Sequence, residues 1–276
     1  MPSIISIISN PFMIRAVIAI VLIGVISATA GSMATFRGLS FFVVGIAHSA
    51  LAGAALMILL DQYGIVRGIN PIFGAIAFCL LVALVVGLSE SESLERLETT
   101  IGVVFAFSMS LALLFISLMR EYSVEAWALI LGDILLLTEK DIIILTITTV
   151  VVSFLFIIFL REFIFISFDP EGSRAIGVNV RLYHILMLVL IAVSTVVLLK
   201  GIGAILVYVV LIVPPTIANR IGKNVTHVMM TSFIISIISG MCGLLLSLVI
   251  AAAPSALIGL ILTVVYFVFI RWHKSS

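Results

Sequence analysis

Residues 38–60 read GLSFFVVGIAHSALAGAALMILL, and this stretch decides the fold class. It contains no Asp, Glu, Lys or Arg, and its apolar residues run on without the alternation of a half-buried strand. A helix rises about 1.5 Å per residue, so about 20 apolar residues cross a hydrocarbon core of about 30 Å. The stretch therefore predicts a membrane-spanning helix.

Other parts of the chain have a similar length and apolar character, at 12–35, 70–88, 100–119, 142–166, 180–199, 202–219, 227–250 and 255–271. The stretch at 202–219 differs because Pro214 and Pro215 remove two backbone donors and are expected to break the helix. A short or re-entrant segment fits it as well as a full span does. The sequence predicts an all-α polytopic membrane bundle of eight or nine segments, formed as one domain over residues 1–276.

Composition supports a membrane protein and excludes several functions. Hydrophobic residues make up 63% of the 276 residues and charged residues 10%, whereas soluble domains carry about 25% charged residues. The net charge of +1 indicates no nucleic-acid partner. No GxxxxGK[ST] loop occurs, and the polar stretches are too short to form a domain that binds and hydrolyses a nucleotide. Energy for uphill transport would have to come from another chain.

Basic residues in short loops predict the orientation. The connections at 161–181 and 220–227 and the C-terminal tail carry most of the Lys and Arg of the C-terminal half, so they are expected in the cytoplasm. The N-terminal half shows no such bias, and the side of the N-terminus stays unassigned.

His48 lies near the middle of residues 38–60. Gly45, Ser49 and Gly53 are spaced by four, so they share a helix face and allow a neighbouring backbone to approach. An imidazole inside the membrane is expected to face the bundle or a watery cavity rather than lipid. It can bind a transition-metal cation, or it can be a structural group bonded to a backbone carbonyl. Position alone leaves both interpretations open.

Residues 167–181, SFDPEGSRAIGVNVR, form the most informative loop. Asp169 is predicted to cap a short helix, with Pro170 at its first position and Glu171 in its first turn. The helix is expected to stop near Gly177. A short helix presented to the cytoplasm suits docking onto a partner, although an ordinary tight connection between spans explains the same residues.

Asp133 follows Gly132 between two spans, on the side opposite to the basic loops. We favour a turn in which the carboxylate bonds nearby backbone, because such turns are common. The alternative is a place at the mouth of a pathway.

In this order, these features resemble the permease subunits of the zinc and manganese ABC importer family, over about residues 12–271. Four stretches carry the resemblance: GIAHSALAG (45–53), TIGVVFAFSMSLALLFISL (100–118), LILGDILLLTEKDI (129–142), and FIFISFDPEGSRAIGVNVRL (163–182) followed by GIGAILVYVVLIVPPTIANR (201–220). Agreement of order, spacing and hydropathy over one chain makes the resemblance specific.

The resemblance implies a type II ABC importer-like fold and a multi-pass homodimer in the lipid bilayer of a prokaryotic cell membrane. Two cytoplasmic ATP-binding subunits would drive it, and an extracytoplasmic metal-binding protein would deliver the ion. No cofactor is expected to stay bound. The cargo, which would bind transiently, is expected to be Zn²⁺ or Mn²⁺, and iron is a less favoured candidate. The chain itself is then a transporter subunit and not an enzyme.

The residues themselves and the resemblance together assign the following roles. The translocation pathway would include His48, with Ser49 and Asp133 as further candidates. ATPase coupling would fall to the loop residues Asp169, Pro170, Glu171, Arg174 and Gly177. Structural packing would fall to Gly45, Gly53, Pro214 and Pro215.

One departure from the family concerns Val44. Many family members carry an Asp four residues before the span-2 His, where both side chains share a helix face and can hold one cation. Here that position is Val44, so the resemblance extends to His48 but not to an Asp–His pair.

Three other functions fit the sequence less well. A stand-alone secondary carrier is expected to have inverted halves and several carboxylates within its spans, and these spans have almost none. An importer of a metal chelate or cofactor with the same architecture would have ten spans and a longer chain. A membrane enzyme would need paired catalytic groups, and histidines 48, 184, 227 and 273 form no such pairing.

Overall fold

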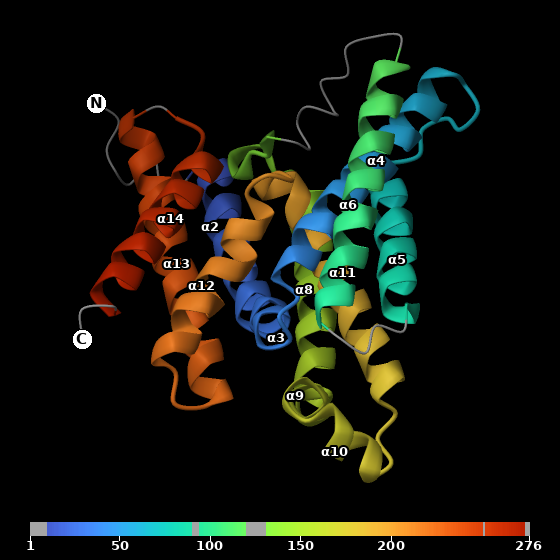
Figure 1. The fold of residues 1–276 in the computed structure, drawn as a ribbon. Helices are drawn as coiled ribbons and strands as arrows, with labels where there is room; N and C mark the ends of the chain where they lie inside the picture. Colours follow the sequence, from blue (N-terminus) through green and yellow to red (C-terminus); the bar gives the residue numbers. More distant parts are fainter. Residues whose placement is uncertain (1–9, 90–93, 120–130, 251, 274–276) are drawn as a thin grey trace.

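The computed structural model describes residues 10–89, 94–119, 131–250 and 252–273. Within these ranges every regular element is helical, and the long helices run roughly alongside one another (Figure 1). The prediction of an all-α membrane bundle is confirmed.

The elements follow one another along the chain with short connections. In order, they are α2 (Pro11–Ile26), the π-helix η1 (Ser27–Gly31), α3 (Ser32–Phe36), α4 (Ser40–Gln62), α5 (Ile72–Leu88), α6 (Leu94–Ser117), the 3₁₀ turn η2 (Ile134–Leu136), α8 (Glu139–Ile158), α9 (Leu160–Phe168), α10 (Pro170–Ala175), α11 (Val180–Ile202), α12 (Val207–Ile221), α13 (Val225–Ile250) and α14 (Pro254–His273).

Among the described residues, seven helical runs are long and apolar enough to cross a membrane. Helices α5 and α12 are shorter apolar helices of 17 and 15 residues. Together they give nine segments, the higher of the two predicted numbers. Helix α2 continues through η1 into α3, so the first span is one run with a π-helical turn inside it.

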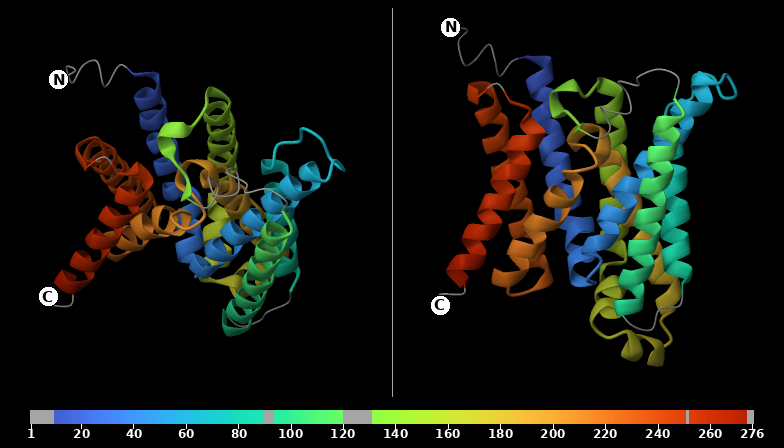
Figure 2. Two further views of the ribbon diagram at one scale, coloured as in Figure 1. Left: turned by 90° about the horizontal axis from the view of Figure 1, so that it is seen from above. Right: turned by 45° about the horizontal axis from the view of Figure 1, so that its top comes forward.

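The two ends of the bundle differ in charge. Helices α9 and α10, the α12–α13 connection and the end of α14 lie at the same end, while α2 begins at the opposite one (Figures 1 and 2). We call the first the basic end, because the elements there carry Arg161, Arg174, Arg181, Arg220, Lys223 and Arg271. The three regions predicted to share one side of the membrane therefore do lie together.

The predicted helix break at Pro214 and Pro215 is wrong. Helix α12 runs unbroken through both prolines, and the interruption lies earlier, between α11 and α12. Gly203 ends α11 with φ +84°, a conformation that glycine adopts without strain. At 15 residues α12 is about 22 Å long, which is too short for a full span, so the expectation of a short segment is confirmed.

The carbonyl that Pro215 leaves without a donor in α12 is paired from η1. Pro215 has no N–H, so the carbonyl of Leu211 loses its helical donor. The hydroxyl of Ser27 donates to that carbonyl at 3.4 Å from within η1. Gly31 makes this approach possible, since a Cβ there would collide with the Leu211 carbonyl oxygen. The π-helical turn and the proline-containing helix therefore fit together as a pair.

The small residues of α4 pack against two different neighbours. Gly53 lies directly against the backbone of Gly74 on α5, so a Cβ at either position would clash. Gly45 instead faces Ile101 of α6, and a Cβ there would meet the Ile101 Cγ2 atom at an ordinary 3.5 Å. The predicted close approach is confirmed at Gly53 but not at Gly45.

We predict that Gly31→Ala destabilises the protein and Gly45→Ala does not. The added methyl at Gly31 meets the rigid Leu211 carbonyl and should cost about 1–3 kcal/mol, as overpacking usually does. The matched change at Gly45 adds a methyl in ordinary contact. Thermal unfolding of the purified protein in detergent would measure both, and equal melting temperatures for the two variants would contradict the prediction.

Candidate functional site

His48 sits in α4 with its ring half-buried against α6. It packs against the ring of Phe105 in a T-shaped arrangement, with a centroid distance of 4.9 Å and an interplanar angle of 85°. Nδ1 lies 2.9 Å from the carbonyl oxygen of Val44, one turn earlier in the same helix. A carbonyl only accepts, so Nδ1 carries the proton and Nε2 keeps its lone pair. The ring is thus held in the tautomer that can bind a cation through Nε2.

Ser49 serves the packing of α4 on α6. It is fully buried, and its hydroxyl donates to the carbonyl of Gly45 at 2.7 Å. Its oxygen is also 2.8 Å from the hydroxyl oxygen of Ser108. Because Ser49 has already used its proton, Ser108 is the donor of that second bond. These bonds occupy Ser49 and connect the two helices.

The surroundings of His48 supply few further ligands. Val44 brings an apolar side chain to the position of the family's Asp. In the parts of the chain that the structure describes, no three His, Cys, Asp or Glu side chains gather closely enough to hold a metal ion. A cation at His48 would therefore need further ligands from water or from another copy of the chain.

Asp133 is held in a turn, as the favoured interpretation predicted. Its carboxylate accepts from the N–H of Leu135 at 2.9 Å and caps η2. Gly132, with φ +61°, packs against the backbone at Gly203, where α11 ends. The hydroxyl of Ser255 donates to the Gly132 carbonyl at 3.1 Å. Asp133 thus belongs to a junction of three segments at the end opposite the basic end.

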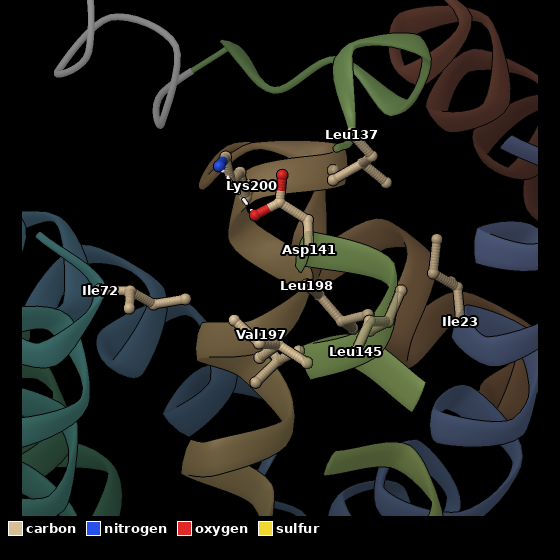
Figure 3. A pocket seen from close by; sticks show the side chains of 10 residues that line it. Ile23, Ile72, Leu137, Asp141, Leu145, Val197, Leu198 and Lys200 are labelled. Carbon is tan, nitrogen blue, oxygen red and sulfur yellow. Dashed lines mark hydrogen bonds and ion pairs between the residues drawn. The ribbon is translucent and has the colours of Figure 1, made fainter. Parts of the chain in front are cut away.

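An ion pair between two spans lies at the same end, and sequence reasoning missed it. Lys200, near the end of α11, donates to Asp141 at 2.8 Å (Figure 3). The other carboxylate oxygen of Asp141 accepts from both the N–H and the hydroxyl of Thr138. The pair borders a cavity of about 20 Å³ and connects the start of α8 to the end of α11. The signal that could have predicted this pair is the presence of opposite charges, Asp141 and Lys200, at span ends on the same side of the membrane.

Several buried hydroxyls have no hydrogen-bond partner. Among the described residues, Ser32, Thr149, Ser232 and Ser236 are buried and make no side-chain hydrogen bond. They come from α3, α8 and α13, and all three helices pack against η1. The helices around the π-helical turn therefore bring unpaired hydroxyls into the apolar core.

The loop at the basic end has the predicted short helix. The Asp169 carboxylate accepts from the N–H of Gly172 at 2.8 Å, Pro170 opens α10, and Glu171 lies in its first turn. The helix ends at Ala175, and Gly177 turns the chain with φ +84°. The capping prediction is confirmed.

The surface of this loop mixes apolar and charged side chains. Phe168 is 65% exposed and Ile176 is 68% exposed, on either side of α10. Glu171 and Arg174 between them are exposed as well. Exposed apolar side chains close to charged side chains are typical of a protein–protein contact.

Comparison with known proteins agrees with this architecture. The chain matches the ABC 3 transport family over residues 9–272. It is 30% identical over 257 residues to the manganese transport system membrane protein MntC of Listeria innocua serovar 6a, covering 93% of this chain and 89% of that protein. It is 26% identical over 240 residues to the high-affinity zinc uptake system membrane protein ZnuB of Haemophilus influenzae, covering 86% and 89%.

A solved structure shares the fold. A chain of PsaBC from Streptococcus pneumoniae in complex with Fab superposes with a TM-score of 0.82 at 24% identity, covering 96% of this chain and 93% of that one. The family match spans nearly the whole sequence, including His48, the α10 loop and the proline-containing α12. The chain therefore belongs to the ABC 3 transport family, and it is the membrane permease subunit of an ABC transporter.

Proposed function

We propose that this permease imports a divalent transition-metal ion, manganese or zinc, using ATP hydrolysed by a separate subunit. The supporting observation is His48, an imidazole in the middle of α4 whose Nδ1 is bonded so that Nε2 can bind a cation. Relatives named for manganese and zinc transport support these two metals as cargo. A single imidazole binds weakly, which suits a pathway that must release what it binds.

The permease is proposed to work as a homodimer. One chain offers His48 without a carboxylate partner, and a second copy could bring its own His48 to the same cation. The remaining ligands would be waters, which Mn²⁺ and Zn²⁺ both accept.

The basic end is inferred to face the cytoplasm, because Lys and Arg are retained on that side. Two ATP-binding subunits would then dock at α10, where Phe168 and Ile176 are exposed beside Glu171 and Arg174. A metal-binding protein would deliver the ion at the opposite end, where Asp133 and the Lys200–Asp141 pair lie.

We predict that His48→Ala abolishes metal uptake and leaves assembly with the ATP-binding subunit intact. The substitution removes the cation ligand but leaves the helix contacts of Gly45 and Ser49 in place. Uptake of radioactive Mn²⁺ and Zn²⁺ into cells would measure it. The matched control is His227→Ala, which changes an exposed histidine at the start of α13. Wild-type uptake of both metals by His48→Ala would remove His48 from the pathway.

Restoring the family's carboxylate should tighten the site. Val44→Asp places an oxygen ligand one turn before His48, and two protein ligands hold a cation longer than one. We expect a lower KM for Mn²⁺ uptake together with a lower maximal rate, because release slows. The concentration dependence of uptake measures both quantities. An unchanged KM would show that the two positions do not share a cation.

The docking role of α10 predicts that Glu171→Arg weakens recovery of the ATP-binding subunit. The substitution reverses a charge on the exposed face of α10 without touching the Asp169 cap. Glu139→Arg is the matched control, because Glu139 is exposed in the first turn of α8 at the other end. Pull-down from detergent extracts measures the complex. Equal recovery for Glu171→Arg and the control would refute docking at α10.

A further inference from the structure

The segment Ser27–Arg37, made of η1 and α3 with Arg37 at its end, connects two parts of the molecule that are far apart in sequence. At the basic end, the Arg37 Nη1 atom donates to the carbonyl of Ile166 in α9 at 2.5 Å. The ring of Phe36 packs beside the ring of Phe168, with centroids 6.0 Å apart. Both contacts reach the last turn of α9, directly before α10.

The end of α9 explains why the Ile166 carbonyl accepts this bond. Helix α9 ends at Phe168 and the backbone of Asp169 is not helical, so no N–H of the helix follows to donate to the Ile166 carbonyl. Arg37 is half-buried, and burial lowers the pKa of its guanidinium from the usual value. Arginine nevertheless keeps its charge, so the bond to the carbonyl is charge-assisted.

The other end of the segment makes an equivalent bond. Pro215 leaves the carbonyl of Leu211 without a helical donor, and the hydroxyl of Ser27 takes it. Gly31 brings the two backbones into direct contact there. The segment thus holds one helix-end carbonyl beside α10 and one proline-orphaned carbonyl in the middle of α12.

We propose that this segment is a strut that transmits movement of α10 to α12, and that Arg37 is the positioning residue at the end of the segment nearest α10. This rests on the proposed docking of an ATP-binding subunit at α10. The strut spans about ten residues, or about 15 Å of helix. Movement of α9 and α10 on ATP binding would carry Arg37 with it and shift α12 through Leu211. A hydrogen-bonded contact at each end makes the strut act in both directions.

The test measures how ATP changes the accessibility of the chain just before the start of α12, at the end of that helix away from the basic end. Ile205 is 61% exposed in the turn before α12, so Ile205→Cys can be labelled with a maleimide. Cys242 is exposed and is replaced by Ala, whereas Cys79 is buried and stays. The permease is assembled with its ATP-binding subunit in proteoliposomes, and the labelling rate is compared with and without ATP.

Without further substitution, we expect ATP to change the labelling rate measurably. Arg37→Ala should abolish most of this change while the complex assembles and hydrolyses ATP. Arg37→Lys should restore part of it, because an ammonium can still donate to the Ile166 carbonyl. Arg15→Ala is the matched control: Arg15 lies in the same helical run and also bonds a backbone carbonyl, that of Pro11, but at the opposite end.

A full ATP response in Arg37→Ala, or no response before Arg37 is changed, would overturn the proposal. If Arg37→Ala does not assemble, Arg37→Met decides, because methionine keeps a long side chain for packing but has no donor for the Ile166 carbonyl. Assembly without an ATP response in that variant would support the strut, and assembly with a full response would refute it. The labelling experiment needs no metal, so it does not depend on the cargo assignment. An incorrect cargo assignment would show separately, as a failure of the permease to take up Mn²⁺ or Zn²⁺.

Discussion

Unpaired backbone carbonyls are the constraint on which this structure depends. Inside a bilayer no water reaches the backbone, so each backbone polar group must find a partner within the protein. Pro215 removes the helical donor of the Leu211 carbonyl, and the end of α9 leaves the Ile166 carbonyl without one. Ser27 donates to the Leu211 carbonyl and Arg37 donates to the Ile166 carbonyl. One short segment therefore stabilises the end of α9 and the proline-containing α12, and this joins the basic end to the middle of the bundle.

Close backbone contact is the second requirement of the packing. Gly31 against Leu211 and Gly53 against Gly74 bring helices together where any side chain would collide. Membrane helices are surrounded by lipid that is as apolar as their side chains, so they gain little from burying apolar surface against each other. Close packing and hydrogen bonds therefore hold the helices together. The Ser49–Ser108 bond and the Lys200–Asp141 pair fulfil the same role at different depths.

The candidate pathway is sparse by comparison. His48 is oriented by its own helix through the Val44 carbonyl, and Phe105 packs against its ring. Neither contact is a metal ligand, so the protein orients one donor and leaves the rest of a cation's shell to be filled from elsewhere. Such a site favours passage over retention, which is what a permease requires of it.

The sequence by itself determined the helical membrane class, the positions of the spans, the short helix at α10 and the turn at Asp133. These follow from local properties: apolar runs of bilayer length, Asp169 followed by Pro170, and an Asp beside a glycine. Only the tertiary structure decided how α12 keeps its helix through Pro214 and Pro215, that Gly53 rather than Gly45 requires a glycine, and that Lys200 pairs with Asp141. Each of these depends on a partner distant in the chain, because the donor for an orphaned carbonyl, or the backbone facing a glycine, comes from another helix.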